Sequence, residues 1–309
     1  MTAADPLVAV LMATYNGAEF LPQQLDSLAS QTHANWRLRV SDDGSRDATL
    51  DILRRYQKAW GPEKLGLVNG PQNGFQGNFM ALTARAPQEA DYCAWSDQDD
   101  VWLPEKLSRA LYCLAPHGQA SPALYCGRTL LTDSRGRAYG LSPLMTRRPP
   151  TFANALMQSL AGGNTMVFNR AARELIAGGI SPVSHDWWAY QMVSGCGGLV
   201  FYDPEPMVRY RQHGANIHGR NIGLAARFLR LKRLFAGVFK RYMDLNLETL
   251  SLTASSLTLE ARGQVENLAE LRRSANPLKR LGLFLSGGFH RQSRAEQLAL
   301  GLAVFLGRV

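Results

Sequence analysis

Three aspartates, Asp97, Asp99 and Asp100, lie within four positions of the stretch WSDQDDVWLPEKL at residues 95–107. Acids packed this closely repel one another, and a turn needs only one of them. Two carboxylates one residue apart in a loop can face a single divalent cation. Mg²⁺ and Mn²⁺ prefer such oxygen ligands and share them with substrate phosphates. The alternative is a solvated turn whose acids cap the next helix. The flanking tryptophans and the apolar stretch DYCAWS before the acids favour the metal site.

Two further polar turns have residue types that suit a nucleotide. SDDGS places Asp42 and Asp43 at the end of an expected strand, where an acid can accept hydrogen bonds from a ribose or a base N–H. Asp-Gly is also an ordinary turn sequence. ATYNG could present backbone N–H groups and Tyr15 to a base, or could be a plain strand-to-helix turn.

The remaining candidates are an acid and a histidine nearer the C-terminus. Asp186 follows His185 in SHDWW, and a carboxylate placed among aromatic side chains is suited to general-base catalysis. The alternative is a helix N-terminal acid favoured by the helix dipole. His213 in YRQHGANIHG could be a third metal ligand, or part of a polar strand end. Zinc spacings, a nucleophile elbow and a Walker lysine loop are all missing from the sequence.

The elements that must position these residues alternate between strand and helix patterns. We expect strands in 7–13, 36–42, 64–70 and 91–96, and helices in 20–28, 47–56 with Asp47 as N-cap, 75–86 and 104–115 with Pro104 in the first turn. Repeated strand–helix units predict a parallel sheet with helices on both faces. Ligands gather beyond the carboxyl ends of such strands, and the turns TYNG, SDDGS and SDQDD all fall there.

Beyond Leu114 the pattern is less regular. It predicts strands around a polar turn in 123–140, a Gly-rich turn with a strand and helix in 160–176, a capped helix carrying Asp186, two late strands in 198–203 and 206–214, and helices from about residue 221 onward.

The positive charge of the chain belongs to its last third. Residues 1–205 hold 17 basic and 19 acidic groups, a net charge of −2, and residues 206–309 hold 17 and 6, a net charge of +11. This predicts an α/β domain over 1–220 and a basic helical region over 221–309. Apolar residues at 224, 228, 231, 235, 238 and 242 line one helix face. That helix could pack on the domain, lie on an anionic membrane surface, or pair in a homodimer. We expect no nucleic-acid partner, because no basic–aromatic module is present.

Composition and targeting signals narrow the compartment. The four cysteines form no metal clip or disulfide framework. The N-terminus lacks the basic segment of a signal peptide, and no apolar run reaches the roughly 18 residues of a spanning helix. We therefore expect a cytoplasmic protein that is peripheral at the inner face of the cell membrane.

Taken together, six stretches resemble the inverting glycosyltransferases of family 2, which have the GT-A fold. In chain order they are VAVLMATYNGAEFLPQQLDSLASQT, VSDDGSRDATLDIL, NGFQGNF, WSDQDDVWLPEKL, GGNTMVFNR and HDWW, within residues 5–220. The form SDQDDVWLPEK, with YRQHGANIHG downstream, resembles the rhamnosyltransferase-type subgroup that builds bacterial surface polysaccharides.

The resemblance implies a GT-A nucleotide-diphospho-sugar transferase fold, a Rossmann-like and mainly parallel sheet flanked by helices. It also implies site residues. The donor nucleotide would contact Ala13, Thr14, Tyr15, Asp42, Asp43, Asn73, Asn78 and Asp97, although the family often has a hydroxyl residue in place of Ala13. Asp99 and His213 would bind Mg²⁺ or Mn²⁺. The donor sugar and acceptor would contact Asp100, Gly162, Gly163, Asn164, His185 and Trp187, and Asp186 would be the catalytic base.

The implied function is metal-dependent, inverting transfer of a sugar to a hydroxyl of a lipid-linked surface polysaccharide such as O-antigen. Rhamnose from dTDP-rhamnose is the expected donor. The alternatives are a UDP-sugar donor and a non-catalytic GT-A-like binding or scaffold protein. A sugar nucleotidyltransferase would show a Gly-rich loop with Arg and Lys after the first strand, which ATYNGAEF lacks.

Overall fold

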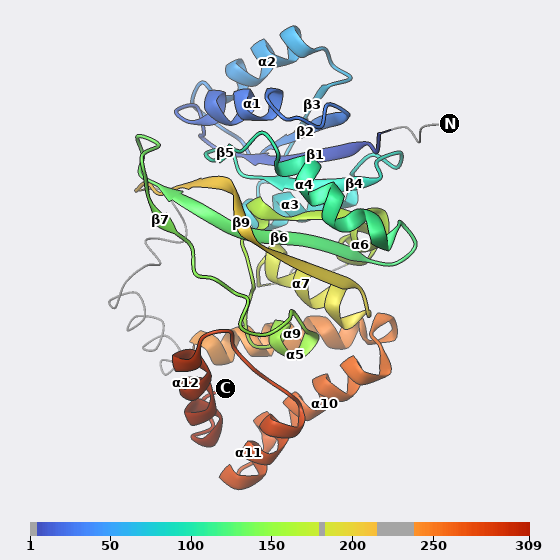
Figure 1. Cartoon of the computed structure of the whole chain (residues 1–309), viewed down its shortest axis with the longest axis vertical. Coiled ribbons are helices and arrows are strands. Elements are labelled where there is room, and N and C mark those ends of the chain that lie inside the picture. Colours follow the sequence, from blue (N-terminus) through green and yellow to red (C-terminus); the bar gives the residue numbers. More distant parts are fainter. Residues whose placement is uncertain (1–4, 179–182, 215–237) are drawn as a thin grey trace.

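The computed structural model describes residues 5–178, 183–214 and 238–309. In Figure 1, one curved sheet runs through the upper part of the molecule, and C-terminal helices form the end opposite α2. The sheet has nine strands in the order β3-β2-β1-β4-β8-β6-β9-β5, with β7 paired to β6.

The first four strands pair in parallel, as the strand–helix pattern predicts. They are β1 (Val8–Thr14), β2 (Trp36–Asp42), β3 (Leu65–Asn69) and β4 (Tyr92–Ser96). The helices of this half are α1 (Leu21–Ala29), α2 (Thr49–Trp60), α3 (Phe75–Ala84) and α4 (Lys106–Leu114). Both faces of β1 are apolar because a core lies on each side. Val8, Val10 and Met12 pack with α1, α2 and α4, whereas Leu11 lies in the core that contains α3.

Two helices begin slightly later than predicted. The N-cap of α2 is Ala48, although Asp47 Oδ1 still accepts from Thr49 N at 3.0 Å. Pro104 lies two residues before α4 rather than in its first turn. These shifts are within the ordinary fraying of helix ends.

The second half of the sheet is mixed. Its strands are β5 (Val101–Trp102), β6 (Ala123–Thr132), β7 (Ala138–Leu141), β8 (Val167–Asn169) and β9 (Leu199–Arg211). β8 is antiparallel to both β4 and β6, whereas β6 and β9 are parallel. The mainly parallel character is therefore confined to the N-terminal half and to the β6–β9 pair.

The prediction of two late strands is wrong, because β9 is continuous. The sequence YDPEPM contains two prolines, which cannot donate ladder hydrogen bonds. The ladder with β6 skips from the Gly127–Asp203 pair to the Thr129–Val208 pair. Pro204 and Pro206 fall in that skipped segment, so the strand continues without requiring their missing N–H groups.

Helices on the other face of the sheet are α5 (Phe152–Ala155), α6 (Arg170–Ala177) and α7 (His185–Gly195). Three short 3₁₀ turns are η1 (Ala115–His117) after α4, η2 (Gly163–Thr165) before β8, and η3 (Ala254–Ser256) among the C-terminal helices. The predicted capped helix is confirmed in α7, because the Ser184 side chain accepts from Trp187 N. The polar turn between β6 and β7, and the turn–strand–helix unit of η2, β8 and α6, are confirmed as well.

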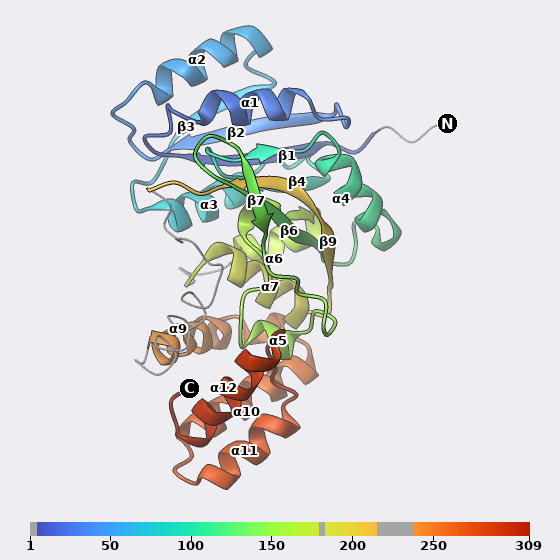
Figure 2. The same ribbon diagram turned by 60° about the vertical axis from the view of Figure 1, so that its left-hand side comes forward.

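The C-terminal helices are α9 (Val238–Leu252), α10 (Leu259–Arg273), α11 (Pro277–Ser286) and α12 (Arg294–Phe305). In Figure 2 all four lie below α7, with α9 level with α5 and α10, α11 and α12 lower down. Met243, Phe284 and Leu300 belong to the same buried cluster as Trp187 and Leu11. The expected boundary at residues 220 and 221, and most of the helix expected over 224–242, lie outside the described residues. Within the described ranges, the helices are too short or too polar to cross a membrane.

Candidate functional site

Loops that are distant in sequence meet at one edge of the sheet. Thr14 pairs with Asp42, and Asp42 pairs with Asn69, so the chain leaves β1, β2 and β3 at the same level. The acidic loop follows β4 at this edge. Because β8 is antiparallel to β4, the turn that precedes β8 also lies here. The end of β9 then brings residues 211–213 to the acids.

The acidic loop gathers its three carboxylates. Ligand oxygens of Asp97, Asp99 and Asp100 lie within 4.8 Å of one another. Gln98 between them bridges to the first loop, because its Nε2 donates to Tyr15 O at 3.0 Å and its Oε1 accepts from Tyr15 N at 2.9 Å. The predicted grouping of this loop with TYNG is therefore confirmed by direct hydrogen bonds.

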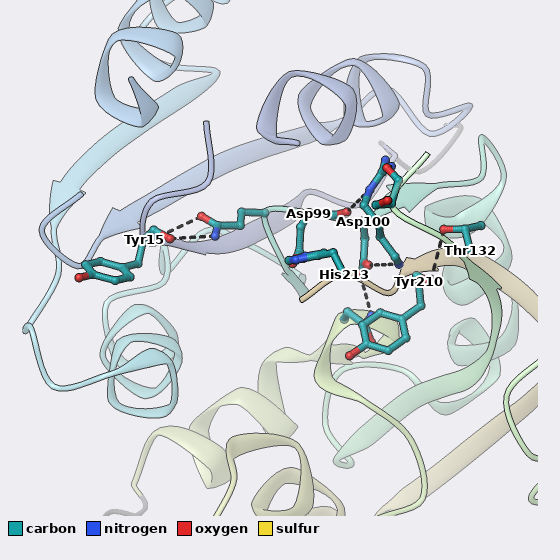
Figure 3. Close-up of polar contacts among 10 residues, drawn as sticks. Tyr15, Asp99, Asp100, Thr132, Tyr210 and His213 are labelled. Atoms are coloured by element: carbon teal, nitrogen blue, oxygen red, sulfur yellow. Dashed lines mark hydrogen bonds and ion pairs between the residues drawn. The ribbon is translucent and has the colours of Figure 1, made fainter. Parts of the chain in front are cut away.

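His213 lies beside the acids, as Figure 3 shows. Its Nε2 is 2.8 Å from Asp99 Oδ2, and its ring packs on Phe20. Arg211, from the same stretch YRQHGANIHG, donates from Nε to Asp99 O at 3.0 Å and from its backbone N to Asp100 Oδ1 at 3.2 Å. The end of β9 thus holds both the backbone and the side chains of the acidic loop.

The glycine-rich turn contacts the acids through Asn164. Its Nδ2 donates to Asp100 Oδ2 at 2.5 Å, and both residues are buried. Gly162 and Gly163 permit close approaches here. A Cβ on Gly163 would lie 2.3 Å from His185 Nε2, so only glycine accommodates that ring. The structure therefore brings Asp100, Gly163, Asn164 and His185 together, as expected.

Asp186 is in the first turn of α7 and partly buried. Its Oδ1 accepts from Trp187 N at 2.7 Å and from the Ser184 hydroxyl. The negative charge of Asp186 is close enough to help raise the pKa of Asp97, so the candidate base lies near the acidic loop. His185 is stacked on Phe79 with 4.4 Å between ring centroids, and burial lowers its pKa, although Asp186 acts in the opposite direction.

Burial and mutual repulsion dominate the electrostatics of the acids. Burial, with the charges of Asp99 and Asp186, raises the pKa of Asp97 to about 8. Burial, Asp99 and Asp97 raise the pKa of Asp100 well above its usual value. Removing a carboxylate from water disfavours its charged form, and neighbouring like charges add to the cost. The site therefore holds an excess of negative charge, which a cation would neutralise.

Lys106 supplies part of the compensating positive charge, and the sequence analysis missed it. This lysine is fully buried, with its Nζ 3.4 Å from the centroid of the Trp102 ring. Burial lowers its pKa to about 7, and Asp100 and Asp97 oppose this shift. A signal was available, because Lys106 stands four residues before Ala110, within the apolar stripe of α4.

The backbone N–H groups of Tyr15, Asn16 and Gly17 are bonded within the protein, which favours the plain strand-to-helix turn over the alternative in which they meet a base. Asn16 N donates to Ser45 Oγ at 2.8 Å and Gly17 N to Thr49 Oγ1 at 2.8 Å. Tyr15 N is engaged by Gln98, as described above. The tyrosine side chain itself is 55% exposed at the edge of the sheet, where a base could stack on it.

Three other residues that the resemblance places at the nucleotide are engaged within the fold. Ala13 is in the core, and Thr14 Oγ1 donates to Asp42 Oδ2 at 2.8 Å. Asp42 also accepts from Ser45 N at 2.8 Å and from the Ser45 hydroxyl at 2.6 Å. Both oxygens of Asp42 are thus used to shape the loop after β2.

Asp43 and the two asparagines form the third side of the site. Asp43 accepts from Gln72 N at 2.6 Å and from Gly74 N at 3.0 Å, which ties it to the loop containing Asn73. Asn78 is buried and donates to Ser41 O at 2.9 Å. Trp187, expected near the sugar, is buried in the core and donates to Ala155 O at 2.6 Å.

The donor set fits a hard divalent cation. Three carboxylates within 4.8 Å provide the oxygen ligands that Mg²⁺ and Mn²⁺ prefer. The raised pKa values of Asp97 and Asp100 indicate that added positive charge would stabilise their ionised forms. Asp97 and Asp100 thus join Asp99 as candidate ligands, and His213 stands beside the trio rather than within it.

Sequence comparison gives a consistent result. The model of the family described as glycosyl transferase family 2 matches residues 9–175. The chain is 28% identical over 232 residues to the dTDP-rhamnosyl transferase RfbG of Shigella flexneri, a match that covers 71% of this chain and 78% of RfbG.

Solved structures share the fold. The chain superposes on S. aureus TarS 1–349 with a TM-score of 0.57 and 16% identity, covering 98% of this chain and 80% of TarS. It also matches the mannosyltransferase PcManGT from Pyrobaculum calidifontis, solved with GDP-Man and Mn²⁺, with a TM-score of 0.54 and 17% identity over 99% of this chain and 86% of PcManGT.

Proposed function

Since the chain belongs to glycosyl transferase family 2, we propose that it transfers a sugar from a nucleoside diphosphate to an acceptor hydroxyl, with inversion, in the synthesis of a bacterial polysaccharide. The observation that carries this proposal is the meeting of the acid trio with Asp186 at the carboxyl edge of the parallel strands. A nucleoside diphosphate needs charge neutralisation as it leaves, and the acceptor needs a base.

Asp186 is the base in this proposal. Its Oδ1 is held by Trp187 N and by the Ser184 hydroxyl, which fixes the direction of the carboxylate. Within the described residues, the hydrogen bonds of Asp186 all use Oδ1, so Oδ2 remains to accept the proton of the acceptor hydroxyl. The acceptor oxygen, having lost its proton, then attacks the anomeric carbon from the face opposite the diphosphate. This single displacement of the diphosphate inverts the configuration.

Asp99 and Asp97 would hold the divalent cation, which supplies neutralisation of the diphosphate when bound. Asp100 and Asn164 hydrogen-bond each other at the floor of the site and position the donor sugar. Tyr15 and Asp43 flank the nucleoside, and His213 keeps Asp99 in place through the contact between its Nε2 and Oδ2.

The donor in this proposal is dTDP-rhamnose. The likeness to RfbG over most of both chains supports it, since that protein is a dTDP-rhamnosyl transferase. TarS has been solved with UDP-GlcNAc, so a UDP-sugar is the alternative that the shared fold allows. The acceptor is a growing, lipid-linked saccharide, which would place the protein at the inner face of the cell membrane.

Thermal unfolding against dTDP, UDP and GDP, each with and without Mn²⁺, tests the donor site. A ligand at a hundredfold excess over its Kd stabilises the native state by about 2.7 kcal/mol. We expect a rise in Tm that needs both Mn²⁺ and dTDP, followed by release of dTDP from dTDP-rhamnose when an acceptor is added. A shift with UDP alone would move the donor to a UDP-sugar. A nucleotide shift without transfer to any acceptor would favour a binding protein.

A further inference from the structure

The outward face of α12 is apolar. Leu298 is 77% exposed, and Leu302 and Phe305 follow on the same face at spacings of four and three residues. On the opposite face, Leu300, Ala303 and Val304 are buried in the core. From Leu298 onward α12 is apolar on both faces, and an apolar helix face normally has a partner. Among the residues that the structure describes, only the inner face of α12 is packed.

The neighbouring helix continues this surface. In α11, Leu278 is 73% exposed and Leu285 is 69% exposed, seven residues apart and therefore on one face. A Cβ added to Gly282 between them would meet nothing within 4 Å, so this face is open. Arg280 of α11 donates to Phe305 O of α12, which holds the two helices side by side. Leu306 adds a sixth large apolar side chain, also exposed.

The charge of the same segment has one sign. Residues 238–276 contain five basic and five acidic groups, so α9 and α10 are neutral together. Residues 277–309 contain five basic groups, Lys279, Arg280, Arg291, Arg294 and Arg308, against Glu296 alone, a net charge of +4. Lys279 is paired with Glu270 of α10 at 2.7 Å, and Arg294 and Arg308 are exposed, so exposed leucines and net positive charge coincide in this segment.

We propose that the outer faces of α11 and α12 dock on an anionic lipid surface. Leucine and phenylalanine side chains enter the boundary between headgroups and acyl chains, while the exposed Arg294 and Arg308 side chains contact anionic headgroups. A second copy of the chain is disfavoured as the occupant, because an isologous contact would bring two segments of charge +4 together. Figures 1 and 2 place both helices at the end of the molecule away from α2, where the sheet does not obstruct approach to a flat surface.

This proposal deepens the proposed function by naming the surface that would meet a membrane-bound acceptor, but it depends on different residues. The test is co-sedimentation of the full chain with vesicles of phosphatidylcholine alone, or with about one third phosphatidylglycerol. The variant Leu298→Gln/Leu302→Gln removes apolar area without changing charge. The matched control Leu252→Gln/Leu259→Gln alters two leucines on the neutral segment that are 61% and 84% exposed, against 77% and 52% for Leu298 and Leu302.

We expect strong binding to the phosphatidylglycerol vesicles, and a partition coefficient that falls by about tenfold or more in the α12 variant but stays unchanged in the control. Sugar transfer to a water-soluble acceptor should be equal in all three proteins. Equal vesicle binding by the α12 variant, or equal binding to pure phosphatidylcholine, would overturn the proposal. So would a dimer in sedimentation equilibrium that the α12 variant dissociates. Failure of transfer with vesicle binding intact would count against the proposed function alone.

Discussion

Asp97 and Asp100 keep their protons more strongly than free aspartates, because both are buried beside Asp99. Three neighbouring carboxylates therefore lower the stability of the folded protein unless a positive charge lies beside them. Lys106 compensates part of their negative charge, and its own pKa falls to about 7 because it too is buried. A divalent cation would compensate the rest, which explains why so many acids occupy one loop.

These shifts predict how stability depends on pH. The pKa of Asp97 is about 8 in the folded protein, against an ordinary value of 3.8. Between these values the folded state binds more protons than the unfolded state, so the free energy of unfolding falls as pH rises. We expect the Tm of the metal-free protein to decrease from pH 4 to pH 7. Above pH 7, loss of the Lys106 proton in the folded state opposes this trend.

Metal binding should reverse the effect, because protons and cations compete for the same oxygens. The rise in Tm produced by Mn²⁺ should therefore be larger at pH 7.5 than at pH 5, as differential scanning fluorimetry can measure. Asp97→Asn should flatten the pH dependence of the metal-free protein. A Mn²⁺ shift that is equal at both pH values would contradict the assignment of these acids to a cation site.

Asp186 provides the clearest test of the chemistry. Asp186→Asn keeps the hydrogen bonds of the side-chain oxygen but removes the base, so transfer should fall by about 10²-fold or more. The stabilisation by Mn²⁺ and nucleotide should persist, since α7 stays capped by Ser184. The matched control is Asp51→Asn, which changes an exposed acid in the first turn of α2. Transfer at the normal rate by the Asp186 variant would remove it from the mechanism.

At the scale of elements, close approach between η2 and α7 shapes the floor of the site. His185 is wedged among Phe75, Phe79 and Trp95, and the backbone of Gly163 lies directly against its ring. The same turn presents Asn164 to Asp100. A change of volume at this contact would therefore move the acids as well as the helix that carries Asp186.

Gly163→Ala tests this contact. The added Cβ would lie 2.3 Å from His185 Nε2, and the aromatic neighbours leave the ring little room to move. Such overpacking costs about 1–3 kcal/mol, so we expect a lower Tm and a lower transfer rate. Gly263→Ala, in α10 with nothing within 4 Å, should instead stabilise by about 0.5–1 kcal/mol. Equal unfolding midpoints for the two variants, in urea or on heating, would refute the tight contact.

At the scale of the whole molecule, the C-terminal helices and the sheet share one core. Leu300 of α12 and Phe284 of α11 belong to the buried cluster that also contains Leu11 of β1. The helical region therefore stabilises the catalytic domain and is not merely attached to it. Its outer surface remains available for contact with other molecules.

Leu300→Ala should consequently destabilise the entire chain. The loss of a fully buried leucine costs about 2–5 kcal/mol. We expect one cooperative unfolding transition with a lowered midpoint, followed both by tryptophan fluorescence and by loss of nucleotide binding. Leu302→Ala, on the exposed face of the same helix, should change the midpoint little. A separate early transition that leaves nucleotide binding intact would show that the helices fold independently.

Some of this architecture follows from the sequence alone. The four parallel strands, the helices between them and the Ser184 cap depend on local periodicity and on capping chemistry, which a short stretch contains in full. The acids of SDQDD and their meeting with TYNG and SDDGS follow as well, because parallel strands end at one edge.

Only the tertiary structure decided the rest. The reversal of direction at β8 and the continuity of β9 past Pro204 each depend on a partner strand far along the chain. The same holds for Asp42, whose oxygens are taken by Thr14 and Ser45, and for Arg211, which meets the acidic loop from more than a hundred residues away. Sequence patterns give the type and period of each element, whereas contacts across the fold determine which polar groups remain for a ligand.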